Sequence, residues 1–359
     1  MKLDDVIGGY RITTQPTNAG GGKCMWAFAE RDGQEYFIKR FLDPKRPKAS
    51  SGPPSRSARI RLQACEEFAD RHRRIMAALK PDQAGGGNLV LAQDFFCEGS
   101  TYYKVTERID TSNLDSPHTL GSGKKSILLK TLGHSLRQLH DIEVVHGDLK
   151  PDNVLVQKTT VFHTAKLIDF DDAFISGNPP GCEEIAGDVL YAAPEWRRYV
   201  QGEEGTGPQL LTTASDIFAL GLLTHLYLTG GLPTFPDAHD SPGEAVNAGA
   251  TLGLDHRLAP GMRVLIGRMC AVIPGDRPGV GAFVSALTPE SCELGPAVAE
   301  PSRRPARTEP EPVEPPANGG RSRLRTNIGG SGSSADSGGG EPERRSDPAR
   351  TSRVRINWS

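Results

Sequence analysis

The chain has 359 residues, 24% of them charged, and a formal net charge of -2 at pH 7. This length allows two ordinary domains or one two-lobed domain, and the balanced charge excludes a general attraction to nucleic acid or membrane surfaces. The 6 cysteines are scattered without a C-x-x-C pair, which favours a reducing compartment over a disulfide framework. The most apolar stretch, residues 217–232, is too short for a bilayer span and contains His225. We therefore expect a cytoplasmic protein with no membrane segment.

The N-terminal part is predicted to form short strands and one long helix. Apolar residues alternate between turns that contain glycine, which is typical of strands, and one longer segment has apolar residues on a single helical face. This order predicts a five-stranded antiparallel sheet with one helix. The expected strands are residues 10–14, 25–30, 35–41, 88–96 and 101–109, and the expected helix is 59–79.

The later part is predicted to be mainly helical, until the composition changes. Helical patterns occur at residues 126–140, 216–228 and 262–272. From residue 289 the chain is rich in Pro, Gly, Ser, Arg and Glu and has few apolar residues. Such a segment cannot bury enough surface to offset the entropy lost on ordering. We therefore expect residues 289–359 to form a disordered tail.

Charged residues stand between two apolar runs in residues 144–156, VVHGDLKPDNVLV. Groups held in this way between buried strands have fixed geometry and a lowered local dielectric. Other short motifs accompany this one in a definite order. The full set is EYFIKRF with Lys39, HGDLKPDN with Asp148, LIDFDDAF with Asp169, APE at 193–195, Ser215-Asp216, and PGDRP with Arg277.

These motifs resemble the protein kinase family over about residues 9–287. The resemblance implies the α+β, bilobal protein-kinase fold for residues 9–288, with a sheet-containing N-lobe at about 9–109 and a mainly helical C-lobe at about 110–288. It also implies that Asp216 holds the catalytic loop and that Arg277 pairs with Glu195.

The resemblance assigns the chemistry to five residues. Lys39 would hold the α- and β-phosphates of ATP, Asp148 would accept the proton of the substrate hydroxyl, and Lys150 would reach the γ-phosphate. Asn153 and Asp169 would bind Mg²⁺. Phosphoryl transfer spreads negative charge over the transferred group, so counter-charge and positioning are what such a site must supply.

A glycine run, Gly20-Gly21-Gly22, precedes Lys39. Its place favours a loop that covers the phosphates of the nucleotide, and we expect all three glycines to contribute to cofactor binding. The run departs from the G-x-G-x-x-G pattern of the family, and an ordinary hairpin turn is the alternative.

The long helix departs from the family, which usually places on it a glutamate that pairs with the strand lysine. Glu66 and Glu67 are the available acids, but both lie off the apolar face, where His72 stands instead. The partner of Lys39 is therefore open between an irregular helix and another acid. The glycine of the family's DFG motif is Asp171 here.

The activation segment, residues 169–195, also departs from the family. Gly147 stands where many kinases have an arginine that pairs with a phosphorylated residue of this segment. Ser176 is the only Ser or Thr in the segment, which already carries several acids. One of them, Asp188, replaces a threonine and can pair with Lys150. We therefore expect activity without phosphorylation of the segment; capture of phospho-Ser176 by another basic residue is the alternative.

The resemblance favours an ATP-dependent enzyme that phosphorylates Ser or Thr hydroxyls of protein substrates. A small-molecule phosphotransferase related to aminoglycoside and choline kinases is the alternative, because H-G-D with a downstream Asn occurs there too. Lys150-Pro151, the APE motif and the apolar helix after Ser215-Asp216 favour the protein kinase. A pseudokinase scaffold is disfavoured because the catalytic and metal-binding residues are present. The chain is similar to soluble bacterial kinases, some of which work beside a PP2C-type phosphatase and a von Willebrand A-type protein.

Overall fold

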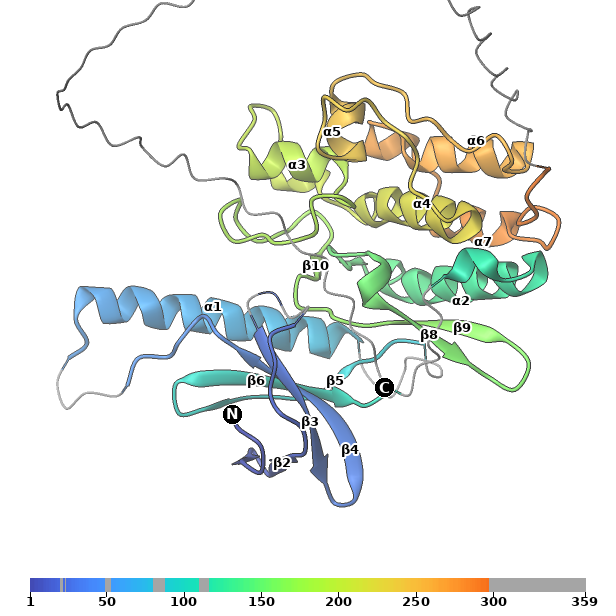
Figure 1. Ribbon diagram of the computed structural model, residues 1–359. Coiled ribbons are helices and arrows are strands. Elements are labelled where there is room, and N and C mark those ends of the chain that lie inside the picture. The colour runs from blue at the N-terminus through green and yellow to red at the C-terminus, as the bar shows by residue number, and fades with distance from the viewer. Residues whose placement is uncertain (20–21, 23, 49–52, 80–87, 110–115, 297–359) are drawn as a thin grey trace, which may run out of the picture. The chain divides into compact units, whose positions relative to one another are not determined.

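The computed structural model describes residues 1–19, 22, 24–48, 53–79, 88–109 and 116–296 (Figure 1). The described N-terminal part contains one antiparallel sheet of 6 strands in the order β1-β2-β3-β4-β6-β5, with helix α1 beside it. The sheet exceeds the five expected strands by β1, a two-residue strand that pairs with β2. The strands are β1 (Val6–Ile7), β2 (Tyr10–Ile12), β3 (Cys24–Arg31), β4 (Gln34–Phe41), β5 (Ala92–Glu98) and β6 (Thr101–Glu107), and the helix is α1 (Arg56–Leu79).

The C-terminal part is mainly helical, with short strand pairs near the sheet (Figure 1). The α+β, bilobal architecture expected from the sequence is therefore confirmed. The helices are α2 (Ser122–His140), α3 (Pro194–Val200), α4 (Ala214–Thr229), α5 (Pro242–Asn247), α6 (Pro260–Met269) and α7 (Val280–Ala286). The short strands are β7 (Val144–Val145), β8 (Val154–Lys158), β9 (His163–Leu167) and β10 (Phe174–Ile175). The 3-10 turns are Pro117–Thr119, Pro151–Asn153, Pro208–Leu210 and Pro274–Asp276.

Helix α1 packs against both parts of the fold through one face. Its middle contributes Cys65 and Ala69 to a small core with Phe41 of β4 and Tyr102 of β6. Its last turns contribute Ile75 and Leu79 to the large core of the helical part. The period of the buried positions is that of an amphipathic helix, so the sequence pattern itself dictates this arrangement. A shift of α1 would therefore disturb both cores.

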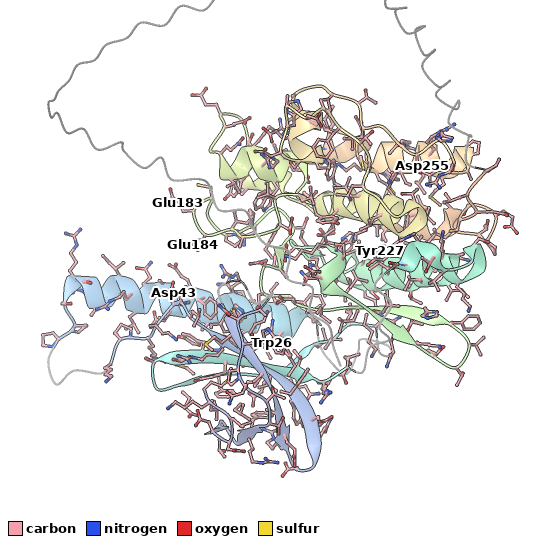
Figure 2. The ribbon with its side chains drawn as sticks, viewed as in Figure 1. Trp26, Asp43, Glu183, Glu184, Tyr227 and Asp255 are labelled. Atoms are coloured by element: carbon pink, nitrogen blue, oxygen red, sulfur yellow. The ribbon has the colours of Figure 1, made fainter. Side chains whose placement is uncertain are left out.

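Helix α4 is buried on all sides, as its continuous apolar sequence predicts. Phe218, Leu222 and Tyr227 belong to the large core, and Figure 2 shows Tyr227 among the helices. Within the part of the chain that the structure describes, no helix is long and apolar enough to cross a membrane.

Two antiparallel strand pairs position the loops that carry the site residues. Strand β8 pairs with β9, and β7 pairs with β10, in both cases antiparallel. The loop from β7 to β8 carries residues 146–153, and the loop from β9 to β10 carries residues 168–173. The two pairings therefore bring the HGDLKPDN and DFDD sequences next to each other.

The packed chain continues beyond residue 288, where the sequence analysis places the start of the tail. Cys292 is buried, and Leu294 forms an isolated bridge with Leu258. Residues 297–359 lie outside the described residues, so the predicted disorder of the tail stays a prediction.

Candidate active site

A buried carboxylate at the start of α4 fixes the loop that carries Asp148. Asp216 accepts hydrogen bonds from the backbone N–H of His146 at 2.8 Å and of Gly147 at 3.1 Å. Its Oδ2 also lies 3.0 Å from Nε2 of His140, on α2. Hydrogen bonds to a buried carboxylate are charge-assisted and therefore strong. The role that the resemblance implies for Asp216 agrees with these contacts.

His146 braces two loops against each other and is fully buried. Its Nε2 lies 3.0 Å from the carbonyl oxygen of Ile168, which can only accept, so Nε2–H is the donor. Its Nδ1 then accepts from the backbone N–H of Asp148 at 3.3 Å. The ring packs 5.2 Å from that of Phe170. Because nothing of His146 reaches the surface, its role is structural.

Three neighbours orient the Asp148 carboxylate. Asn153 donates from Nδ2 to Oδ2 at 2.8 Å, and the Lys150 ammonium lies 2.7 Å from the same oxygen. The backbone N–H of Asp188 donates to Oδ1 at 2.8 Å. The carboxylate of Asp188 lies 3.8 Å from the Lys150 ammonium, which is the pairing that the sequence suggested. Burial alone would lower the pKa of Lys150, but the Asp148 carboxylate raises it above its ordinary value.

Lys39 lies in the interior of β4 and faces two aspartates of the DFDD sequence. Its ammonium is 2.8 Å from both carboxylate oxygens of Asp169 and 2.8 Å from Oδ2 of Asp171. Burial alone would lower the pKa of Lys39, yet these two carboxylates raise it above its ordinary value. Glu66 and Glu67 of α1 are exposed to solvent, so the acid beside Lys39 comes from the loop after β9 rather than from the helix.

The oxygen atoms near Asp148 fit a magnesium ion. Mg²⁺ prefers carboxylate and amide oxygens and keeps several waters or phosphate oxygens. Asp169 presents a carboxylate from a left-handed backbone conformation with φ of 63°. Asn153 uses its amide nitrogen toward Asp148, which leaves its amide oxygen as the available ligand. A bound magnesium ion would neutralise negative charge on the phosphates there.

Only one residue of the glycine run Gly20-Gly21-Gly22 is among the described residues. Gly20 and Gly21 lie outside the described residues, and Gly22 forms a turn before β3 with φ of 53°. The indole N–H of Trp26 donates to the carbonyl oxygen of Ala19 at 2.9 Å and so fixes the start of this turn. The role of the three glycines in phosphate binding stays a prediction.

A buried ion pair supports the end of the activation segment. Arg277 donates to both carboxylate oxygens of Glu195, at 2.7 and 2.6 Å, and both side chains are 0% exposed. The Ser215 hydroxyl donates to the same carboxylate at 2.8 Å. The pairing of Arg277 with Glu195 that the resemblance implies is therefore present.

A pocket opens beside Asp148 on the side of the activation segment. Its wall includes aromatic side chains of the segment and of α3 as well as the backbone around Ala192 and Ala193. The residues that line it are Gly147, Asp148, Leu149, Phe174, Asp188, Tyr191, Ala192, Ala193, Trp196, Ser215, Asp216 and Ala219. Figure 2 shows Glu183 and Glu184 on the exposed loop of the same segment. The candidate acceptor of a proton thus lies at the edge of a partly apolar hollow.

The sequence analysis missed one charged residue near the site, Lys104, and counted another, Asp172, only among the acids of the activation segment. Lys104 is buried on β6, directly opposite Lys39 of β4 in the strand register. A lysine at an inward position of a strand is the signal that would have found it. Asp172 is the other, because burial, followed by the charges of neighbouring aspartates, raises its carboxyl pKa to about 7.

Comparison with known proteins identifies the family. The profile of the protein kinase domain matches residues 22–286, which is most of the chain. The chain therefore belongs to the protein kinase family. MAP kinase-activated protein kinase 2 from Homo sapiens is 23% identical over 252 residues, which cover 69% of this chain and 55% of that protein.

Two further relatives come from other organisms. Protein kinase kin1 of Schizosaccharomyces pombe is 26% identical over 277 residues, 76% of this chain and 30% of that protein. Serine/threonine-protein kinase pkn2 of Myxococcus xanthus is 31% identical over 139 residues, 38% of this chain and 15% of that protein. The chain therefore spans little more than half the length of the human relative, and less than a third of the Schizosaccharomyces pombe and Myxococcus xanthus proteins.

Proposed function

We propose that this chain is a magnesium- and ATP-dependent protein kinase that transfers the γ-phosphate to Ser or Thr hydroxyls of proteins. The observation that carries the proposal is the Asp148 carboxylate, which Asn153, Lys150 and the backbone of Asp188 orient at the edge of a pocket. An oriented carboxylate can accept the proton of a hydroxyl as the phosphoryl group is transferred.

Each remaining site residue is given the role that its position supports. Lys39, buried opposite the DFDD loop, would hold the α- and β-phosphates, and Lys150, beside Asp148, would stabilise the γ-phosphate. Asp169 and Asn153 would hold Mg²⁺. The set is a cation, a proton acceptor and two oxygen ligands, which is what a phosphoryl transfer site requires.

The hollow beside Asp148 favours a protein substrate over a small molecule. Tyr191 and Trp196 line it together with backbone of the activation segment, and the buried Glu195–Arg277 pair supports that wall from below. Aromatic and backbone groups beside the proton acceptor Asp148 suit an extended peptide that carries the substrate hydroxyl. Specificity for Ser and Thr is supported by Lys150 and by the names of the relatives.

The activation segment supports activity without phosphorylation. Ile185 is buried against Val145, Trp196 and Leu211, which holds the middle of the segment by apolar packing. The backbone N–H of Ser176 donates to the carbonyl oxygen of Glu143 at 2.8 Å. These packing and backbone contacts support a segment whose order does not depend on a phosphate. The association with a PP2C-type phosphatase and a von Willebrand A-type protein stays a prediction from the resemblance.

Purified chain with labelled ATP and Mg²⁺ tests the proposal. We expect phosphate on Ser or Thr of casein-type proteins and none on kanamycin or choline. Asp148→Asn should remove nearly all transfer and leave the fold intact, because asparagine has nearly the same shape but cannot accept the proton. Transfer to kanamycin or choline alone would establish the small-molecule alternative, and absence of any transfer by the wild type with all acceptors would point to the pseudokinase.

A further inference from the structure

The acid nearest Lys39 besides Asp169 stands where the family has glycine. Asp171 contacts Lys39 at 2.8 Å through Oδ2, and its Oδ1 contacts the ammonium of Lys104. The Nε2 of His72, from α1, lies 3.5 Å from the same Oδ1. Three side chains from three elements therefore converge on one carboxylate whose side chain is 14% exposed.

The charges of this cluster balance only when Asp171 is counted. Lys39 and Lys104 are both buried, on neighbouring strands, with their backbones paired in register. Asp169 and Asp171 are the two carboxylates that face them. A buried charge left without a partner is strongly unfavourable. Glycine at position 171 would leave Lys104 in that state.

Asp171 is also the acid that stays available to Lys39. Asp169 is the candidate metal ligand, and a bound Mg²⁺ would neutralise much of the negative charge of its carboxylate. Asp171 is not a candidate metal ligand, and it forms ion pairs with both Lys39 and Lys104. Lys39 can therefore keep its position through Asp171.

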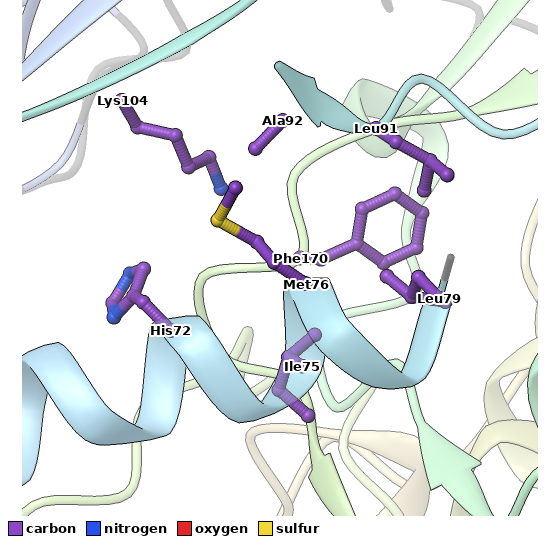
Figure 3. A pocket seen from close by; sticks show the side chains of 8 residues that line it. All are labelled: His72, Ile75, Met76, Leu79, Leu91, Ala92, Lys104 and Phe170. Atoms are coloured by element: carbon purple, nitrogen blue, oxygen red, sulfur yellow. The ribbon is translucent and has the colours of Figure 1, made fainter. Parts of the chain in front are cut away.

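His72 supplies the link to α1. Its Nδ1 lies 3.0 Å from the carbonyl oxygen of Phe68, so Nδ1 carries the hydrogen, and Nε2 faces Asp171. Nε2 is buried and makes no hydrogen bond within the described residues. The ring stacks on Phe95 at 4.8 Å and meets Phe41 edge-on at 5.2 Å, which fixes its place. Figure 3 shows Lys104 extending toward α1, from which His72 projects.

We propose that Asp171 is the positioning residue for Lys39 and that Asp171, Lys104 and His72 together replace the helix glutamate of the family in coupling α1 to the nucleotide site. The carboxylate stands on the loop and the imidazole that faces it stands on the helix, whereas the family usually places the carboxylate on the helix. The proposal rests on the proposed kinase function, since it concerns how Lys39 is held for ATP.

The test removes the carboxylate at position 171 and places one on helix α1 at position 72. In the full chain, Asp171→Gly should raise the Kd for ADP with Mg²⁺ and the KM for ATP by about tenfold or more, because Lys39 and Lys104 lose their partner. His72→Glu alone should also weaken binding, because two carboxylates would then face each other. The combination of Asp171→Gly with His72→Glu should bind ADP at least about threefold more tightly than Asp171→Gly alone.

A second measurement reports the coupling between α1 and the nucleotide site without phosphoryl transfer. Hydrogen exchange in residues 65–79 of α1 should slow when ADP and Mg²⁺ bind to the wild type and to the combined variant, and should change little in Asp171→Gly. A combined variant that binds no better than Asp171→Gly would overturn the coupling through position 72. An ADP Kd for Asp171→Gly within twofold of wild type would overturn the proposal as a whole.

Two further double variants serve as controls. One tests binding in a protein whose folding should be intact, and the other tests whether Glu66 or Glu67 is the partner of Lys39. Asp171→Asn with Lys104→Met removes one charge of each sign, so the fold should keep its melting temperature, yet ADP binding should weaken because Lys39 still loses its carboxylate. Normal ADP affinity in that variant contradicts the proposal. Glu66→Gln with Glu67→Gln is the matched control and should bind ADP like the wild type; tenfold weaker binding would assign the partner to the helix. Wild-type transfer to protein and its loss in Asp148→Asn report on the proposed function separately.

Discussion

Gly147 lies so close to Asp172 that a Cβ atom at position 147 would stand 2.5 Å from the carbonyl oxygen of Asp172. Its φ of 80° is a conformation that other residues adopt at a cost. On its other side, the carbonyl oxygen of Gly147 would be 3.1 Å from a Cβ at Gly187. The backbone at Gly147 therefore lies close to the activation segment at both Asp172 and Gly187, and the absence of an arginine side chain has a steric reason.

Replacement of Gly147 should be costly for this reason. We expect Gly147→Ala to lower the free energy of unfolding by about 2–4 kcal/mol, since it adds a clash with a backbone atom to the cost of positive φ. Gly202→Ala is the matched control: φ there is 67°, and a Cβ would meet nothing within 4 Å. Urea unfolding of both variants measures the difference. Equal losses would show that the clash is relieved by movement of the loop.

The buried pair under the activation segment gives a second prediction. Arg277→Met leaves the Glu195 carboxylate buried with only the Ser215 hydroxyl, and we expect a loss of about 3–5 kcal/mol in the free energy of unfolding. The exposed pair of Arg73 with Asp70 on α1 is the control, and Arg73→Ala should cost about 0–0.5 kcal/mol. A loss below about 1 kcal/mol for Arg277→Met would mean that water enters the site and hydrates Glu195.

Substitutions of the metal ligand Asp169 and of the proton acceptor Asp148 should have different effects on how much Mg²⁺ increases the affinity for ADP. Asp169→Asn removes a ligand of Mg²⁺, so the gain in ADP affinity that Mg²⁺ gives the wild type should shrink about tenfold or more. Asp148→Asn should keep that gain, because the proposed role of Asp148 is to accept the proton of the substrate hydroxyl rather than to bind the metal. Titration calorimetry with ADP, with and without Mg²⁺, measures both. Equal loss in the two variants would contradict the division of roles.

Asp172 should make stability depend on pH. Burial, then the charges of Asp148, Asp171 and Asp169, raises its carboxyl pKa from 3.8 to about 7. The folded state then holds a proton that the unfolded state has lost between about pH 4 and pH 7, so this contribution favours folding at low pH and is lost as the pH rises through 7.

The variant Asp172→Asn isolates this effect. From pH 5 to pH 8, in EDTA, the wild type should lose more free energy of unfolding than Asp172→Asn, because asparagine has no proton to release. The exposed Asp237→Asn should follow the wild type. Parallel curves for wild type and Asp172→Asn would show that the Asp172 carboxyl titrates near its ordinary pKa in the folded protein.

The sequence predicts those parts of the site that local spacing decides. Asp148 and Asn153 lie five residues apart on one loop, and a turn of that length brings them together. The partner of Lys39 could not be predicted, because Asp171 is 132 residues away and its position depends on how the loop after β9 passes under β4. The helical pattern of α1 placed Glu66 and Glu67 off the apolar face and left an irregular helix or another acid as the alternatives. Likewise β1, with two residues, is too short to show any alternation.

The buried position of Ile185 predicts that the enzyme is active without phosphorylation of the activation segment. Ile185 is buried with Val145, Trp196 and Leu211, so the activation segment has an apolar anchor where many kinases use a phosphate. Ser176→Ala, and wild type treated exhaustively with phosphatase, should therefore keep the phosphotransfer rate within about twofold. Ile185→Ala removes buried apolar atoms worth about 2–4 kcal/mol and should lower the rate by tenfold or more by loosening the segment.

The two interventions separate packing from phosphate as the source of order. The exposed Val189→Ala is the control for Ile185→Ala, and it should keep most of the activity. Proteolysis of the segment in each variant reports its order, since cleavage follows local opening. If Ser176→Ala or phosphatase treatment removes most of the activity while Ile185→Ala does not, a basic residue that captures phospho-Ser176 controls the enzyme instead. We expect the opposite result, because Gly147 offers no side chain for a phosphate and the segment is already held at both ends.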